Sequence, residues 1–112
     1  MNPKALARGG EDAAVALLVD QGYEIVGRNV RMPGGEIDVV AREGATVVFV
    51  EVKARSSDRF GSAVGAVDAR KRRTLRKLAA EWMQLFAPRA FARFDVVAAD
   101  GARLALYKDA FR

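Results

Sequence analysis

The pattern of apolar and polar positions at the start of the chain changes from a helical to a strand-like period near Gly22. Residues 5–20 repeat apolar side chains at spacings of three and four, which is typical of one face of a helix. Asn2 is a suitable N-cap and Pro3 a suitable first helical residue. The glycine pair at 9–10 weakens the middle of this helix and offers an alternative start. Gly22 predicts its end.

Three strand-like runs follow the helix. Residues 23–29 form the first, and a turn through residues 33–35 leads to two more runs at 36–41 and 46–53. The last two are rich in Val and Ile, and only four residues separate them. This spacing predicts a β-hairpin.

The second half of the chain predicts a loop, a helix and two strands. Residues 55–65 are polar and contain two glycines, which favours a loop. Residues 68–86 carry Leu, Ala, Trp and Phe at helical spacing, and Pro88 ends this amphipathic helix. Residues 91–98 and 103–107 are expected to be closing strands. The predicted order is αβββαββ, which is a mixed α/β domain.

The geometry of the predicted hairpin brings acidic side chains together. A turn at residues 43–44 and a four-residue loop over 42–45 both fit the sequence. Both give the same pairs further along: Val40 with Val47, Asp38 with Phe49, and Glu36 with Glu51. Asp38 and Glu51 are then diagonal neighbours, about 7–8 Å apart at the backbone and within reach of one ion.

Side-chain alternation gives this hairpin one wholly apolar face and one face that is charged at one end. The charged face holds Glu36, Asp38, Val40, Val47, Phe49, Glu51 and Lys53. Since apolar residues share it, we expect a sheet that is covered on both sides. Grouped acids repel one another without a cation. Lys53 balances part of this charge, so a structural ion cluster remains an alternative to a functional carboxylate–lysine site.

Glu11 is a further acid in an unusual position. It falls within the apolar stripe of the first helix, where a charge is unfavourable unless it is paired or near water. If the helix starts at Gly10, the helix dipole favours an acid there for a purely structural reason. A functional role for Glu11 becomes the better interpretation if the helix packs over the charged end of the hairpin.

Composition restricts the available chemistry. The 112 residues suit one domain, residues 1–112, and contain neither Cys nor His. Disulfides, thiol nucleophiles, imidazole bases and His-ligated zinc are therefore excluded. No run approaches the roughly 18 apolar residues of a membrane span, and no secretory signal follows the N-terminus. We expect a soluble, cytoplasmic protein.

The positive charge is concentrated in one segment. The formal net charge is +5, and residues 53–77 hold nine Lys or Arg against two acids, a net charge of +7. A bare charge run is usually a solvated helix face. Here it flanks a carboxylate cluster, which is the combination that metal-dependent phosphodiester chemistry needs.

Motifs along the whole chain match those of a known family. In chain order they are Gly10-Glu11-x-x-Ala14, Gly22-Tyr23, Asn29-x-Arg31, Gly35-Glu36-Ile37-Asp38, Phe49-Val50-Glu51-Val52-Lys53-x-Arg55, Phe60-Gly61, Lys71, Arg93-Phe94-Asp95-Val96 and Asp109-Ala110-Phe111. The series resembles the bacterial YraN-type proteins, a family of uncertain function similar to Holliday-junction resolvases. That family belongs to the PD-(D/E)xK restriction-endonuclease-like superfamily. The resemblance implies a three-layer domain with a mixed central sheet between flanking helices.

The resemblance also implies site residues. Asp38 matches the first motif acid, although Ile37 precedes it where Pro is usual. Glu51 and Lys53 match the Glu-x-Lys motif, and Glu11 matches the helix acid that joins the metal site in resolvase-like members. The three acids would hold Mg²⁺ or Mn²⁺, which lowers the pKa of a bound water. The lysine would orient that water or stabilise charge on the phosphoryl oxygens.

The implied reaction is hydrolysis of a nucleic-acid phosphodiester, in DNA rather than RNA and on branched or irregular substrates by family analogy. The residues expected to contact phosphates are Arg55, Lys71, Arg72 and Arg73. Resolvases act as two-fold dimers, so the resemblance suggests a homodimer here. The sequence itself shows no recognisable dimer interface.

Two other functions remain open at this point. One is a nucleic-acid-binding protein whose nuclease site is vestigial. The other is a structural or partner-binding protein whose basic helix recognises an acidic protein or a membrane, and its Trp82 stripe is more typical of a core than of a membrane anchor. Steep loss of affinity with salt would indicate nucleic-acid binding.

Overall fold

The computed structural model describes residues 3–55, 67–100 and 103–112. It contains two helices and five strands in the predicted order: α1 (Pro3–Asp20), β1 (Glu24–Met32), β2 (Gly35–Glu43), β3 (Thr46–Arg55), α2 (Ala69–Phe86), β4 (Phe91–Asp100) and β5 (Arg103–Phe111). The helix α1 runs continuously through the glycine pair, so the alternative start there is wrong. Most of the predicted 55–65 loop, with the Phe60-Gly61 motif, lies outside the described residues.

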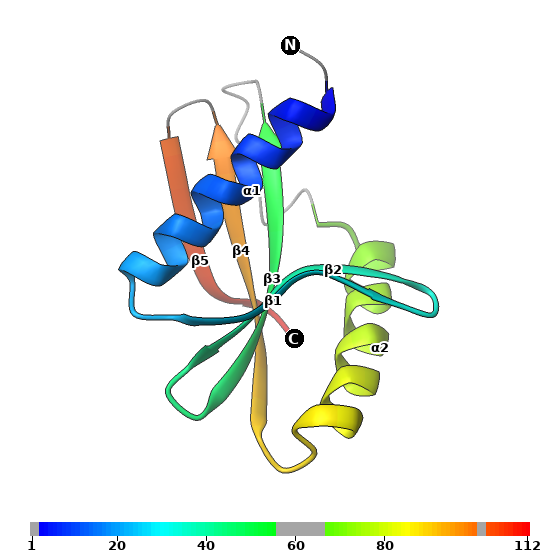
Figure 1. Cartoon of the computed structure of the whole chain (residues 1–112). Helices are drawn as coiled ribbons and strands as arrows, with labels where there is room; N and C mark the ends of the chain where they lie inside the picture. Colours follow the sequence, from blue (N-terminus) through cyan, green and yellow to red (C-terminus); the bar gives the residue numbers. More distant parts are fainter. Residues whose placement is uncertain (1–2, 56–66, 101–102) are drawn as a thin grey trace.

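The five strands form one mixed sheet in the order β1-β2-β3-β4-β5 (Figure 1). Pairing is antiparallel except between β3 and β4, which are parallel and joined by the crossover that contains α2. Successive residues of β2 face opposite helices: Val39 packs with Leu18 of α1, and Val40 packs with Trp82 of α2. The predicted mixed α/β domain with a sheet covered on both faces is confirmed.

The register of the β2–β3 hairpin differs from both expected registers. The structure pairs Glu43 with Thr46, which leaves a two-residue loop, and Val40 lies opposite Phe49 rather than Val47. The shift along the partner strand is two residues. Because side chains alternate with a period of two, this shift leaves Val39, Val40 and Phe49 on their predicted faces. Ile37 departs from its prediction: it was expected on the apolar face with Val39, but it packs with Val40 in the cluster against α2.

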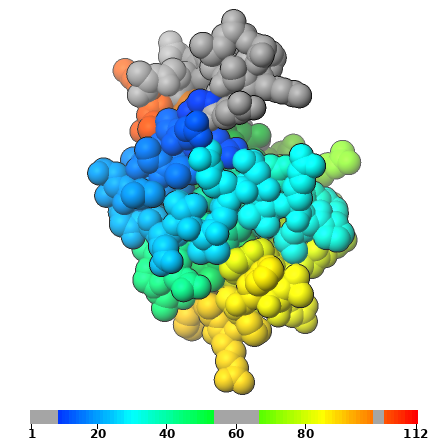
Figure 2. Space-filling view, in the orientation of Figure 1, coloured from blue at the N-terminus to red at the C-terminus, as the bar shows by residue number. Residues whose placement is uncertain are grey.

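The turn between β1 and β2 folds over α2. In the space-filling view this hairpin, in cyan, lies between α1 and the yellow end of α2 (Figure 2). A Cβ at Gly35 would stand 3.1 Å from the Leu78 side chain of α2, so glycine permits this close approach. The contact explains why Ile37 is buried against α2 and fixes the strand that carries Asp38.

The helix α2 begins with a capped N-terminus. The Asp68 side chain accepts a hydrogen bond from the backbone N–H of Lys71 at 2.8 Å, as an N-cap does. Leu75, Leu78, Ala79 and Trp82 form the buried stripe of the helix, as its spacing predicted. Phe86 was expected in the same stripe but is 67 % exposed. In the part of the chain that the structure describes, no helix is long and apolar enough to span a bilayer.

Candidate active site

The two central acids of the predicted site lie side by side where the pairing of β2 with β3 ends. Pairing of β2 with β3 ends at Val39 and Val50, so Asp38 and Glu51 occupy the next opposed positions. Continued by one residue, this register would oppose Asp38 to Glu51 rather than set them diagonally, and the expected opposition of Glu36 to Glu51 is wrong. The Asp38 carboxylate accepts a hydrogen bond from the backbone N–H of Val52 at 2.9 Å. The side chain therefore supplies an acceptor where the strand pairing has stopped.

Burial makes this carboxylate pair electrostatically unfavourable. Glu51 is only 5 % exposed, and its desolvation, together with the charge of Asp38, raises its pKa to about 7. Desolvation also raises the pKa of Asp38. One oxygen of Glu51, Oε2, is buried without a hydrogen-bond partner among the described residues. A buried acceptor without a donor is a destabilising feature that a bound cation would relieve.

Two lysines face the pair and partly offset its charge. The Lys71 Nζ lies 3.8 Å from Oε1 of Glu51, and the charges of Lys71 and Lys53 lower the pKa of Glu51. Lys71 stands in the first turn of α2, where the helix dipole disfavours a cation. The nearby carboxylates explain why a cation is stable there.

Glu11 is close to the pair but has partners of its own. Its charge contributes to raising the pKa of Asp38. Its Oε1 accepts hydrogen bonds from Asn29 Nδ2 at 2.8 Å and from Arg28 Nη2 at 3.4 Å. Across residues 3–55, 67–100 and 103–112, the structure gathers no three acids into a metal-binding group. Asp38 and Glu51 come together, and Glu11 does not join them.

The donor set nevertheless fits a hard divalent cation. Asp38 and Glu51 present carboxylate oxygens, which Mg²⁺ and Mn²⁺ prefer. The unpartnered oxygen of Glu51 gives such an ion a ready ligand. Glu36, in contrast, pairs with the exposed Arg31 at 3.6 Å and stays at the margin of the site.

The predicted phosphate-binding residues have different surroundings. The Arg72 Nε donates to the carbonyl of Val67 at 2.7 Å, and its guanidinium lies 5.3 Å from the centre of the Phe111 ring. Arg73 is exposed on α2. Arg55 ends β3, and its side chain lies outside the described residues.

A second polar centre, which the sequence analysis did not single out, surrounds Asp95 on β4. Asp95 is fully buried and accepts hydrogen bonds from Tyr23 Oη at 2.6 Å, from Arg93 Nε at 3.0 Å and from the backbone N–H of Asp109 at 2.9 Å. These contacts join the start of β1 to β4 and β5. The signals in the sequence were the Arg93-Phe94-Asp95-Val96 motif and an acid in a largely apolar strand.

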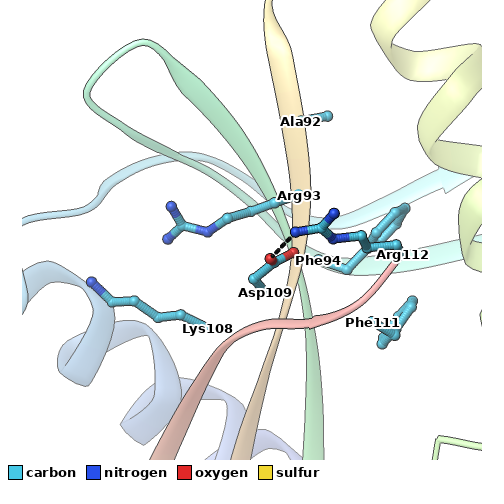
Figure 3. Close-up of a pocket in the computed structure, with 7 residues that line it drawn as sticks. All are labelled: Ala92, Arg93, Phe94, Lys108, Asp109, Phe111 and Arg112. Carbon is cyan, nitrogen blue, oxygen red and sulfur yellow. Dashed lines mark hydrogen bonds and ion pairs between the residues drawn. The ribbon is translucent and has the colours of Figure 1, made fainter.

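A cavity of about 590 Å³ adjoins this centre at the end of β5 (Figure 3). Its lining consists of Ala92, Arg93, Phe94, Lys108, Asp109, Phe111 and Arg112. Arg93 and Lys108 both pair with Glu43, at 2.7 and 2.8 Å, and Arg112 pairs with Asp109 at 3.0 Å. Because these cations already have anionic partners, we assign the cavity no role in the chemistry.

The chain also matches known sequences. Residues 10–99 match the family model described as "Uncharacterised protein family UPF0102". A UPF0102 protein of Shewanella amazonensis is 47 % identical over 111 residues, covering 99 % of this chain and all of that protein. A UPF0102 protein of Moorella thermoacetica is 54 % identical over 91 residues, covering 80 % of this chain and 75 % of that protein.

Proposed function

This chain belongs to the uncharacterised family UPF0102, and we propose that it is a divalent-metal-dependent nuclease with a PD-(D/E)xK-type site on a restriction-endonuclease-like fold. The observation that carries the proposal is the buried pair of Asp38 and Glu51, with one Glu51 oxygen lacking a partner among the described residues. A pair that is unfavourable when empty is well suited to bind a cation. The flanking lysines add the positive charge that phosphodiester chemistry requires.

Each side chain has a distinct task in this proposal. Asp38 and Glu51 hold Mg²⁺ or Mn²⁺, with Glu11 as the candidate third ligand. The ion supplies Lewis acidity and lowers the pKa of a bound water. Lys53 orients the attacking water or stabilises negative charge on the phosphoryl oxygens, and Lys71 contacts a substrate phosphate from the start of α2.

The substrate we propose is DNA, held against the site by the basic residues of α2. Arg70, Arg73 and Lys77 are exposed on this helix, on the side away from its buried stripe. Contacts of this kind bind phosphates without reading bases. Branched or irregular DNA and a homodimer remain part of the proposal by family analogy. A cytoplasmic location is also part of the proposal.

Cleavage assays with purified protein test this function. Wild type, Glu51→Ala and Glu24→Gln are incubated with Mn²⁺ and end-labelled junction, flap and duplex DNA. Glu24 is an exposed acid of β1 and serves as the matched control. We expect cleavage by wild type and Glu24→Gln, and loss of at least 100-fold in Glu51→Ala, since removal of a metal ligand removes the reactive water.

The other outcomes identify the alternatives. Equal cleavage by all three proteins would show a contaminating nuclease and would contradict the proposal. Equal DNA binding without cleavage would indicate a binding protein with a vestigial site. Absence of DNA binding at low salt would indicate instead that the basic helix binds an acidic protein.

A further inference from the structure

Asn29 is the residue of β1 whose backbone departs most clearly from a strand. Its φ of 50° lies in the left-handed region, which is strained for most non-glycine residues and which Asn adopts more readily than others. Only one other described non-glycine residue, Asp109, has a positive φ. Such strain persists where the surrounding structure requires it, so its consequence at Asn29 is informative.

The strand register shows where Asn29 would otherwise point. Arg28 pairs with Val39 and Val30 pairs with Ile37, which sets Asn29 opposite Asp38. In a regular strand Arg28 and Val30 would share one face and Asn29 would point to the other, but Val30 packs against the cluster at α2. Arg28, its neighbour, belongs to the α1 face and reaches Glu11 and Asp12 there.

The positive φ breaks this alternation. Asn29 and Arg28, consecutive in the strand, both reach the same oxygen of Glu11, with Asn29 Nδ2 at 2.8 Å. The Glu11 side chain is only 16 % exposed, so these donors fix it at the sheet edge nearest Asp38. The backbone conformation of Asn29 thus directs its side chain to Glu11 of α1, from the position of β1 that lies opposite Asp38.

We propose that Asn29 is a positioning residue that holds Glu11 ready to join Asp38 and Glu51 around a divalent cation. The inference rests on the proposed function and adds a residue to it. Hydrogen bonds from outer residues commonly fix a metal ligand's orientation, and their removal weakens metal binding about 10–100-fold. Asn29 donates such a bond from its carboxamide to Glu11, and its backbone conformation directs the side chain toward that residue.

Calorimetric titration of Mn²⁺ into metal-free protein tests this role without any cleavage assay. Asn29→Gly is the informative variant, because glycine tolerates a positive φ and only the carboxamide is lost. We expect Mn²⁺ affinity to fall about tenfold in Asn29→Gly and by a similar factor in Glu11→Gln. The double variant should show no further fall, since both changes interrupt one link. Thermal melting of each variant confirms that it is folded.

The outcomes separate this inference from the proposed function. Saturable Mn²⁺ binding that is equal in wild type and Asn29→Gly, but lost in Glu51→Gln, would overturn the positioning role alone. Additive losses in the double variant would also overturn it, because Asn29 and Glu11 would then act independently. Absence of saturable binding in wild type would overturn both proposals.

Discussion

At Glu51, burial and charge act in opposite directions. Desolvation and the neighbouring Asp38 favour the protonated carboxyl, while Lys71 and Lys53 favour the carboxylate. The first two effects are larger, since the pKa rises from 4.5 to about 7. Near pH 7, Glu51 of the metal-free protein is therefore protonated in about half of the molecules, and a bound metal ion would displace that proton. Metal binding should release protons near pH 7.

This raised pKa predicts an unusual pH dependence of stability. Glu51 binds its proton more tightly in the folded chain than in the unfolded chain, so the metal-free protein loses stability as pH rises from about 4.5 through 7. The loss from this group is up to about 3 kcal/mol. Thermal melts in chelator at pH 5 and pH 8 measure it. Glu51→Gln should reduce the loss and melt higher than wild type at pH 8; an unchanged loss in this variant would contradict the raised pKa.

Asp95 has the opposite character, because its buried charge is well paired. Replacing it with Ala leaves the donors of Tyr23, Arg93 and Asp109 without their acceptor. Breaking a buried pair in this way typically costs about 3–5 kcal/mol. Urea unfolding of Asp95→Ala should show a loss of that size, together with a folded-state Mn²⁺ affinity equal to wild type. A loss below about 1 kcal/mol would mean that water replaces the network.

At the scale of elements, α2 presents neighbouring arginines to different surroundings. Arg73 is exposed, whereas Arg72 contacts the Val67 carbonyl and the Phe111 ring. We expect Arg73→Ala to weaken DNA binding several-fold and to reduce the slope of log affinity against log salt by about 1. Arg72→Ala should mainly lower the melting temperature. Fluorescence anisotropy between 50 and 200 mM salt separates the two effects. Identical salt slopes for wild type and Arg73→Ala would exclude a phosphate contact at Arg73.

The elements themselves were predictable because each has a clear period, but the hairpin register was not. A slip of two residues leaves every side chain on the same face, so the apolar pattern cannot distinguish the registers. The register is set by the two-residue loop, in which Gly44 takes a φ of 60°. Glu43 stays in the strand because Arg93 and Lys108 hold it there. Those partners are 50 or more residues away in the chain.

At the scale of the whole molecule, the site depends on the crossover between two parallel strands. The chain leaves β3 after the second acid and returns through α2, whose first turn brings Lys71 back to Glu51. Periodicity in the sequence carries no information about this return. The family motifs named Asn29, Tyr23 and Asp95 without giving them a role. Their contacts, the hydrogen bond from Asn29 to Glu11 and the bonds that Asp95 accepts, are visible only in the fold.

The most direct measurement is a crystal structure of the protein soaked in Mn²⁺, with anomalous diffraction recorded at the manganese edge. We predict a single strong peak within coordination distance of carboxylate oxygens from both Asp38 and Glu51. A saturating soak that leaves the space between these two side chains without anomalous density, in a crystal where both are ordered, would contradict the proposed metal site.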